Sequence, residues 1–393
     1  MKYDVIIVGA GPAGSAAAQL LAKQHFNVLL LDRTSFPREK ICGDGLTPGA
    51  TELLNTLGVL QNLSEHQRYP IQAIRFATPR MQILDVPFTS RHKTGNFLVI
   101  PRKILDQVLL QKAIESGAHF EIGTVQNVIR QDDRVVGCEI RAYGQLQKRY
   151  AKIVIGADGA SSVVARVLNK HKVDARHRFL AIRSYVKGFE TLPGLVEFYW
   201  TNELKPGYFW IFPLNENEAN IGLGLPADLY LKSNFRLKER FRSYLDRPIF
   251  ARRKLPDFQI SEPQSWPIPL AGVKEFHRVF NGAMLVGDAG YWVDPLSGEG
   301  IHNALQTGVF AARVAAKALR AGRFDRQFLQ EYEQLCQKKL GGVIRRSSLF
   351  IWGMRHLPWL LEGYFWLARH NPLAFQKFFS NLSHDFKFEF KKD

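Results

Sequence analysis

The chain has 393 residues, of which 46% are hydrophobic, and it carries a formal net charge of +17. This length supports two joined domains around a sizeable core. The three cysteines, Cys42, Cys138 and Cys336, lack C-x-x-C spacing, which argues against a zinc site and a disulfide framework and favours a reducing compartment. The apolar stretch 349–368 contains Glu362 among other polar residues, so we do not expect it to span a membrane.

The N-terminal segment has the pattern of a strand, a glycine-rich turn and a helix. Val5–Val8 is a short apolar run typical of a buried parallel strand, and Gly9, Gly11 and Gly14 follow it in G-x-G-x-x-G spacing. Such glycines allow a pyrophosphate to approach the backbone and the N-terminus of the next helix. A second apolar strand ends at Asp32, whose carboxylate can accept hydrogen bonds from the ribose of an adenosine. The segment is therefore predicted to bind a dinucleotide.

Two later turns favour FAD over NAD as that dinucleotide. Residues 285–289 form an apolar strand that breaks into a Gly-Asp turn, and a helix is predicted from about 301 to 319. Asp288 in this turn is placed to bind ribityl hydroxyls, and the helix N-terminus at Gly300 is placed to stabilise negative charge on a reduced isoalloxazine. Another strand leads into a Gly-Asp-Gly turn that contains Asp158. Carboxylates at the ends of buried strands suit a long ligand with many hydroxyl groups.

These segments, with the helix start at Arg102, resemble the FAD-dependent oxidoreductases built like para-hydroxybenzoate hydroxylase. GAGPAG, GADGASS and LVGDAG correspond to the GxGxxG, DG and GD motifs of that group, and the similarity spans roughly residues 3–320. Two further segments are similar to the geranylgeranyl reductase branch: the cysteine–glycine segment 38–46, and the aromatic strand 206–213 with the following residues 220–224. This branch also contains hydroxylases, so the resemblance leaves the substrate open.

The resemblance implies an α/β fold with a Rossmann-like FAD-binding domain, an inserted antiparallel substrate-binding sheet and a C-terminal helical segment. Alternating, β-branched stretches outside the motifs agree with the strands of such a sheet. The predicted division is 1–70, 99–170 and 278–325 for the FAD domain, 71–98 and 171–277 for the substrate sheet, and 326–393 for the C-terminal segment.

The motifs and the resemblance together predict a non-covalent FAD site, and the resemblance places Cys42 close to the flavin ring. No second G-x-G-x-x-G follows a strand, so electrons are expected from NAD(P)H bound across the FAD domain, from a ferredoxin-like donor or from a quinol. No metal site is expected. The predicted cofactor-binding residues are Gly9, Gly11, Ala13, Gly14, Asp32, Arg33, Cys42, Gly43, Gly45, Arg102, Val125, Asp158, Gly287, Asp288, Pro295, Gly298, Gly300 and Ile301.

The aromatic strand supplies the candidate substrate pocket. Tyr208, Trp210 and Phe212 alternate along it, so they share one face, and an aromatic wall suits a polyprenyl chain better than a small charged acid. We expect these three residues and Trp266 to line the pocket. The catalytic candidates are Tyr208, Trp210 and Cys42, the last as a proton donor or redox partner. Packing in the core is the alternative role for each of them.

Three classes of function are open. In a reductase, reduced FAD passes a hydride to a carbon–carbon double bond of a polyprenyl or other hydrophobic substrate, while an acid protonates the neighbouring carbon. In a monooxygenase, reduced FAD captures oxygen and hydroxylates an aromatic or lipophilic substrate. In a non-catalytic protein, FAD only stabilises a lipid-binding fold. The aromatic strand and the Cys42 segment together favour the reductase.

The C-terminal part of the chain is both aromatic and basic. Residues 349–393 hold twelve aromatic residues, with cations such as Arg355 and Lys387 among them. They are predicted to form a helical cap packed on the FAD domain, or a helix that lies in a membrane interface with its cations on anionic lipid, and the two are compatible if one face packs inward. Because no nucleic-acid module accompanies the positive charge, the expected partners are a hydrophobic or lipid substrate and an anionic membrane surface. The expected location is the cytoplasm, including peripheral attachment to the inner face of the membrane.

Overall fold

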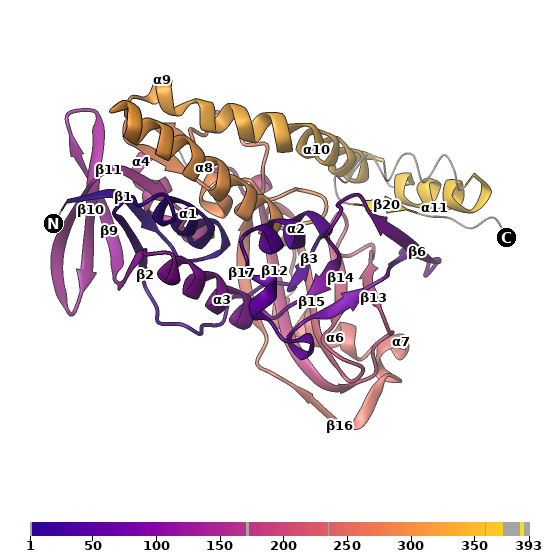
Figure 1. Ribbon diagram of the computed structural model, residues 1–393. Coiled ribbons are helices and arrows are strands. Elements are labelled where there is room, and N and C mark those ends of the chain that lie inside the picture. The colour runs from indigo at the N-terminus through magenta and orange to yellow at the C-terminus, as the bar shows by residue number, and fades with distance from the viewer. Residues whose placement is uncertain (1, 170–172, 235, 358, 372–385, 389–393) are drawn as a thin grey trace.

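Two large β-sheets lie side by side and form the framework of the molecule (Figure 1). In this computed structural model the N-terminus belongs to one sheet, and α11 (Leu360–His370) lies at the opposite end of the molecule. The predicted α/β fold class is confirmed. The structure describes residues 2–169, 173–234, 236–357, 359–371 and 386–388.

The first sheet carries the glycine-rich turn. Its strands are β1 (Lys2–Val8), β2 (Val28–Asp32), β8 (His119–Ile122), β9 (Thr124–Gln131), β10 (Arg134–Ala142), β11 (Gln145–Gly156), β18 (Val279–Phe280) and β19 (Ala283–Leu285). The order β19-β11-β1-β2-β8 is parallel throughout, while β9, β10 and β18 add antiparallel pairs. Val8 pairs with Leu31 on one side and Gly156 on the other, so the predicted motifs follow strands that end together.

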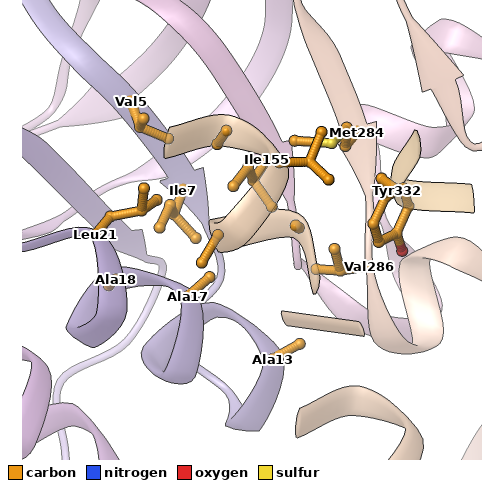
Figure 2. Close-up of a cluster of buried hydrophobic side chains, with 14 of the residues drawn as sticks. Val5, Ile7, Ala13, Ala17, Ala18, Leu21, Ile155, Met284, Val286 and Tyr332 are labelled. Carbon is orange, nitrogen blue, oxygen red and sulfur yellow. The ribbon is translucent and has the colours of Figure 1, made fainter. Parts of the chain in front are cut away.

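Three helices pack on this sheet because small residues let them approach closely. They are α1 (Pro12–Ala22), α3 (Arg102–Glu115) and α8 (Ile301–Ala321). A Cβ at Gly308 of α8 would lie 2.3 Å from the carbonyl oxygen of Ala13 in α1, so only glycine permits this crossing. Figure 2 shows the core beneath, where Val5 and Ile7 of β1 meet Leu21 of α1. Its other labelled members include Ala17, Ala18, Ile155, Met284, Val286 and Tyr332.

Shorter helices fill the connections. The α-helices are α2 (Pro48–Thr56), α4 (Val163–Leu168), α5 (Ala227–Tyr230), α6 (Leu237–Leu245), α7 (Pro248–Ala251) and α9 (Arg326–Leu329), and the 3-10 helices are η1 (Leu60–Asn62), η2 (Glu65–Gln67), η3 (Gly159–Ser161), η4 (Ala175–His177) and η5 (Gly287–Gly290). The second Gly-Asp turn of the sequence is thus η5. It leads to α8, which starts at Ile301 as predicted and ends where Gly322 adopts a left-handed conformation (φ 64°).

The second sheet has nine strands. They are β5 (Ala73–Ala77), β6 (Ile83–Ser90), β12 (Arg178–Phe189), β13 (Leu195–Tyr199), β14 (Tyr208–Pro213), β15 (Glu218–Pro226), β16 (Lys254–Ile260), β17 (Gln264–Pro269) and β20 (Phe386–Phe388). The order is β16-β12-β15-β14-β13-β5-β6-β20, with β17 also on β12. It is antiparallel as predicted except that β5 and β13 pair in parallel, because they come from two separate chain segments that no hairpin connects. The division into domains at the predicted boundaries stays a prediction.

A small third sheet follows the Cys42 segment directly. It consists of β3 (Gly45–Leu46), β4 (Tyr69–Ile71) and β7 (Phe97–Val99). Because β3 is only two residues long, the segment passes straight into α2, whose first turn begins with Pro48 after an extended Thr47. The Cys42 segment is therefore anchored on its C-terminal side by both strand pairing and a helix start.

Two C-terminal helices connect the sheets. α10 (Glu331–His356) extends from α8 towards the second sheet, where α11 (Leu360–His370) lies near β20 (Figure 1). The start of α10 buries Tyr332 in the core of the first sheet, whereas Phe350 near its end and Phe365 of α11 join the core of the second. The predicted cap therefore packs on both sheets, not on the FAD domain alone. Within the described ranges no helix combines the length and apolar character needed to cross a bilayer. Residues 372–385 and 389–393, with Phe375, Phe378, Phe379 and Phe390, lie outside the described residues.

Candidate active site

One cavity of about 590 Å³ extends from the carboxyl ends of β1 and β2 to the inner face of the second sheet. Gly9, Asp32 and Asp288 line one part and Trp210 another, so the structure brings the predicted cofactor and pocket residues to a single space. Of those predicted residues, Gly14 is outside the lining. A Cβ at Gly14 would lie 1.8 Å from the carbonyl oxygen of Gly9, so its bare backbone serves the packing of the loop instead of ligand contact.

The glycine-rich loop forms a cradle that fits a pyrophosphate. Gly9 has a left-handed conformation (φ 104°), and a Cβ there would lie 2.3 Å from the carbonyl oxygen of Ala157. Gly11 instead opens onto the cavity, since the nearest atom to a Cβ there is Arg38 Nη2 at 3.8 Å. As the N-cap of α1, Gly11 offers no side-chain cap, which leaves amide groups of the first turn for an anion. The residues present therefore fit the FAD that the sequence predicts.

A chain of ion pairs lies beside this cradle. Asp32 Oδ2 accepts a hydrogen bond from Ala10 N at 2.9 Å and lies 3.8 Å from Arg38 Nη2. Arg38 also pairs with the fully buried Asp106 at 3.2 Å, and Arg102 holds Asp106 through two hydrogen bonds of 2.7 and 2.8 Å. Arg38 and Asp106 were not predicted. The Asp106 signal was its position four residues after Arg102, the spacing of one helical turn.

The two predicted Gly-Asp carboxylates differ in what they do. Asp158 accepts hydrogen bonds from Ser162 Oγ at 2.5 Å and from Val163 N at 2.7 Å, so its own turn occupies it. Asp158 lines the cavity and its carboxylate caps the start of α4, so direct cofactor binding by this carboxylate stays a prediction. The Asp288 carboxylate makes no hydrogen bond to any residue that the structure describes. It is free to accept hydrogen bonds from a ligand.

The N-terminus of α8 is only partly open. Its N-cap, Gly300, offers no side-chain cap, which agrees with a role in stabilising negative charge. However, Glu299 Oε1 accepts a hydrogen bond from His302 N at 3.0 Å, so one amide of the first turn is already used. Pro295, Gly298, Gly300 and Ile301 all line the cavity.

The Cys42 segment contacts both parts of the cavity. Asp44 follows Cys42 by two residues, and its Oδ1 accepts a hydrogen bond from Arg102 N at 3.2 Å. Gly43 packs against Phe212, where a Cβ would lie 3.2 Å from the ring. Burial raises the pKa of the Cys42 thiol, and the nearby Arg102 guanidinium opposes that shift, so the thiol is protonated at neutral pH.

Lys40 lines the same part of the cavity, and a second cation, Arg183, donates a hydrogen bond to its carbonyl oxygen at 3.3 Å. Burial lowers the pKa of Lys40 to about 8, and its ammonium lies 4.1 Å from the ring centre of Trp266. Arg183, which is buried, stacks on Tyr185 with its guanidinium carbon 4.1 Å from the ring centre. Trp266 therefore holds a cation on its face as well as lining the pocket.

The aromatic wall is wider than the one strand that predicted it. Tyr208, Trp210 and Phe212 of β14 all line the cavity. Tyr208 Oη donates to the carbonyl oxygen of Ser297 at 2.8 Å and burial raises its pKa, so it is fixed as a hydrogen-bond donor. A Cβ at Gly222 of β15 would lie 2.1 Å from Trp210 Cζ2, so this glycine makes room for the indole. The wall also includes Ile74, Phe76, Phe97, Phe179, Phe198 and Trp200, none of them predicted.

The C-terminal helices close the cavity. Leu340, Ile344 and Phe350 of α10 line it, as do Leu361 of α11 and Phe386 of β20. The sequence predicted either a packed cap or a membrane segment here and gave no sign that these residues form part of the pocket. The reason is that all five come from elements far along the chain from the aromatic strand.

Comparison with known proteins agrees with this site. Residues 2–347 match the model of an FAD binding domain family. Together with the glycine cradle and the parallel sheet, this defines the protein as an FAD-dependent oxidoreductase with FAD as its cofactor.

Individual relatives show which family of FAD-dependent oxidoreductases the chain resembles. Digeranylgeranylglycerophospholipid reductase 2 of Methanococcoides burtonii is 31% identical over 365 residues, which cover 88% of this chain and 83% of the relative. Menaquinone reductase of Mycolicibacterium smegmatis is 32% identical over 345 residues, covering 82% of this chain and 77% of the relative. A solved geranylgeranyl bacteriochlorophyll reductase-like structure from Thermoplasma acidophilum is 25% identical with a TM-score of 0.81, covering 91% of this chain and 88% of that chain. The chain belongs to the geranylgeranyl reductase family, as its motifs indicated.

Proposed function

We propose that the protein saturates carbon–carbon double bonds in the polyprenyl chain of a lipid. The supporting observation is a single cavity in which a dinucleotide cradle continues into an aromatic, apolar wall. The names of two relatives denote reductases of a geranylgeranyl phospholipid and of menaquinone, and both compounds carry isoprenoid chains. When bound, reduced FAD supplies the hydride for such a reduction.

The residues that would hold FAD follow from the geometry described above. The amides around Gly11 would bind the pyrophosphate, Asp32 the adenosine ribose and Asp288 the ribityl hydroxyls. The buried Arg102–Asp106 pair supports this part of the cavity from α3.

Saturating a double bond also requires a proton, and Cys42 is our candidate for its source. Its thiol is protonated at neutral pH because burial raises its pKa. When the S–H bond breaks and the proton passes to carbon, the Arg102 guanidinium and the Asp44 N–H, which lies 3.4 Å from Cys42 Sγ, stabilise the thiolate. After the saturated chain has left the cavity, a proton from bulk solvent restores the thiol. Tyr208 and Trp210 would hold the chain in place and exclude water.

The test is an anaerobic reaction with chemically reduced protein and a geranylgeranyl phospholipid, followed by mass spectrometry of the lipid. We expect a gain of two hydrogen atoms for each bond reduced. A product that forms only in air and gains an oxygen atom would support the monooxygenase instead. A flavin that reduces and reoxidises without changing any lipid would support the non-catalytic alternative.

We further propose that the protein lies peripherally on an anionic membrane from the cytoplasmic side. Four large apolar residues are exposed in α10, in α11 and at the N-cap of α11: Leu349 (69%), Trp352 (58%), Trp359 (64%) and Trp366 (60%). The same helices line the cavity with Phe350 and Leu361, so the exposed residues lie next to the substrate space. Tryptophan is favoured at membrane interfaces, and the net charge of +17 favours anionic lipid.

A further inference from the structure

A buried polar group joins the Cys42 segment to the aromatic wall. Asn220 of β15 donates through Nδ2 to the carbonyl oxygen of Cys42 at 2.7 Å and to Asp44 Oδ2 at 2.8 Å. Its Oδ1 accepts a hydrogen bond from Trp210 Nε1 at 3.2 Å. Asn220 and Asp44 are fully buried. One amide therefore holds two of the catalytic candidates, Cys42 through its backbone and Trp210 through its ring.

Asp44 connects this amide to two more elements. It has a left-handed backbone conformation (φ 68°), which residues other than glycine rarely adopt. Its carboxylate accepts hydrogen bonds from Arg102 N at 3.2 Å, Tyr185 Oη at 2.7 Å and Asn220 Nδ2 at 2.8 Å. These donors come from α3, β12 and β15. The strained turn is thus fixed from three sides by groups distant in sequence.

The turn around Asp44 packs closely against the aromatic residues that line the cavity. A Cβ at Gly45 would lie 2.6 Å from Phe212 Cε2, so the turn around Asp44 sits directly on the aromatic strand. Gly43 is similarly close to both Phe212 and Trp210 Nε1, at 3.2 and 3.6 Å from a Cβ. A shift of the turn would therefore meet the rings that line the pocket.

We propose that Asn220 is a positioning residue which, with Asp44, sets the placement of Cys42 relative to the aromatic wall. The effect of this positioning on catalysis rests on the proposed function. Asn220 acts through Cys42 and Trp210 and is not itself assigned a chemical step. Without its amide, the Cys42 segment loses its two hydrogen bonds from β15, and Trp210 loses the acceptor of its indole N–H.

The test measures the reactivity of Cys42 in the FAD-bound protein without any lipid. Iodoacetamide labelling is followed by mass spectrometry at each cysteine in wild type, Asn220→Leu, which keeps the size but not the hydrogen bonds, and Asn220→Asp. Ser184→Ala is the control, because Ser184 is also fully buried in the second sheet but bonds to Ser261, away from the Cys42 segment. Cys138 and Cys336 are buried and report any general loosening of the fold.

We expect Asn220→Leu to raise the labelling rate of Cys42 about tenfold, with Ser184→Ala at the wild-type rate and the other two cysteines unlabelled. In Asn220→Asp the rate relative to wild type should fall towards one as the pH is lowered, because a protonated carboxyl regains a donor for Asp44. A Cys42 rate equal to wild type in both variants would overturn the proposal. If Asn220→Leu also exposes Cys138 and Cys336, the test rests on Asn220→Asp instead. A ratio of its Cys42 labelling rate to that of wild type that stays constant with pH would then overturn the proposal.

Turnover provides the second readout. If the lipid is reduced as proposed, Asn220→Leu should lower kcat about tenfold while KM changes less than twofold, since the wall away from Cys42 is intact. A change confined to KM would contradict positioning. Absence of lipid reduction in wild type would overturn the proposed function. The labelling rates alone would then decide whether Asn220 positions Cys42.

Discussion

At the scale of single residues, carboxylates in similar motifs have different roles because of their neighbours. Asp158 and Asp288 both lie just after a buried strand, two residues after Gly156 and directly after Gly287, and the sequence predicted both as cofactor ligands. Ser162, four residues after Asp158, donates to its carboxylate, whereas Asp288 has no such partner among the described residues. The serine pair in GADGASS was a local signal for this capping role. Asp44 gave no comparable signal, because its partners Arg102, Tyr185 and Asn220 are distant in the chain.

The free carboxylate of Asp288 leads to a test of cofactor binding. Replacing Asp288 by Ala should weaken FAD binding about ten- to a hundredfold, since a charge-assisted hydrogen bond contributes about 1.5–3 kcal/mol. FAD titration of the apoprotein, followed by flavin fluorescence, measures the change. Asp246→Ala is the matched control, because its carboxylate side chain is 70% exposed. Equal affinity in the two variants would exclude Asp288 from the site.

The burial of Asp44 leads to a prediction about pH. Burial raises the pKa of Asp44 to about 6, above its ordinary value of 3.8. The protonated form is thus favoured in the folded state, so the stability contributed by this raised pKa is complete below about pH 4 and lost as the pH rises through 6. Relative to Asp44→Asn, which does not titrate, wild type should gain about 2 kcal/mol in free energy of unfolding as the pH falls from 7 to 4.

Urea unfolding at several pH values measures this difference. The comparison uses the same FAD saturation for both proteins, because ligand binding itself stabilises the folded state. A difference between wild type and Asp44→Asn that stays constant across this pH range would show that Asp44 is not buried as a titrating carboxylate. The same variant should also label faster at Cys42, since it loses the acceptor that Arg102 N or Tyr185 uses.

At the scale of elements, local patterns in the sequence predicted where strands and turns lie better than they predicted which elements pair or pack with one another. The glycine spacing after β1 and the alternation in β14 are local properties, and both segments lie where those patterns suggested. The parallel β5–β13 pair and the closure of the cavity by α10 were missed, because they depend on contacts between segments more than a hundred residues apart. Asn220 shows the same limit: a polar residue in an otherwise apolar strand is visible in the sequence, but its three partners are not.

The cavity face of β15 carries alternating residues that the aromatic wall requires. Asn220, Gly222 and Gly224 share this face, and each glycine leaves room for a ring. We predict that Gly222→Ala, whose Cβ would lie 2.1 Å from Trp210 Cζ2, displaces the indole and lowers kcat/KM for the lipid about tenfold or more. FAD content should be unchanged. The matched control is Ile221→Val, which removes a methylene from the opposite, buried face. Similar activity in the two variants would place Trp210 outside the reacting part of the pocket.

At the scale of the whole molecule, the C-terminal helices have one face that packs inward and one that faces outward, the arrangement in which a packed cap and a membrane contact are compatible. Their inner faces complete the cavity and their outer faces expose tryptophans. Such an arrangement suits a substrate whose isoprenoid chain must pass from a bilayer to the flavin end without entering water. Burying that chain stabilises the complex by about 25 cal/mol for each Å² of apolar surface.

The outer face therefore leads to a prediction for membrane binding. Replacing Trp366 of α11 and Trp359 at its N-cap together by Ser should lower binding to vesicles of mixed anionic and zwitterionic phospholipid about tenfold, because two exposed rings no longer enter the interface. Flotation of full-length, FAD-bound protein measures the bound fraction. Tyr143→Ser is the control, since Tyr143 is 90% exposed at the turn between β10 and β11, at the other end of the molecule (Figure 1).

The salt concentration and a detergent-dispersed substrate distinguish membrane binding from other roles of the exposed tryptophans. Binding of wild type should weaken as salt is raised and on purely zwitterionic vesicles, because screening reduces the attraction of a +17 chain to anionic lipid. With a short, detergent-dispersed prenyl substrate the double variant should turn over at the wild-type rate, since the side chains lining the cavity are unchanged. Wild-type protein that stays at the bottom of the gradient at low salt would show that the exposed tryptophans serve another contact. Loss of turnover on the dispersed substrate would show instead that α11 shapes the pocket and does not act as a membrane contact.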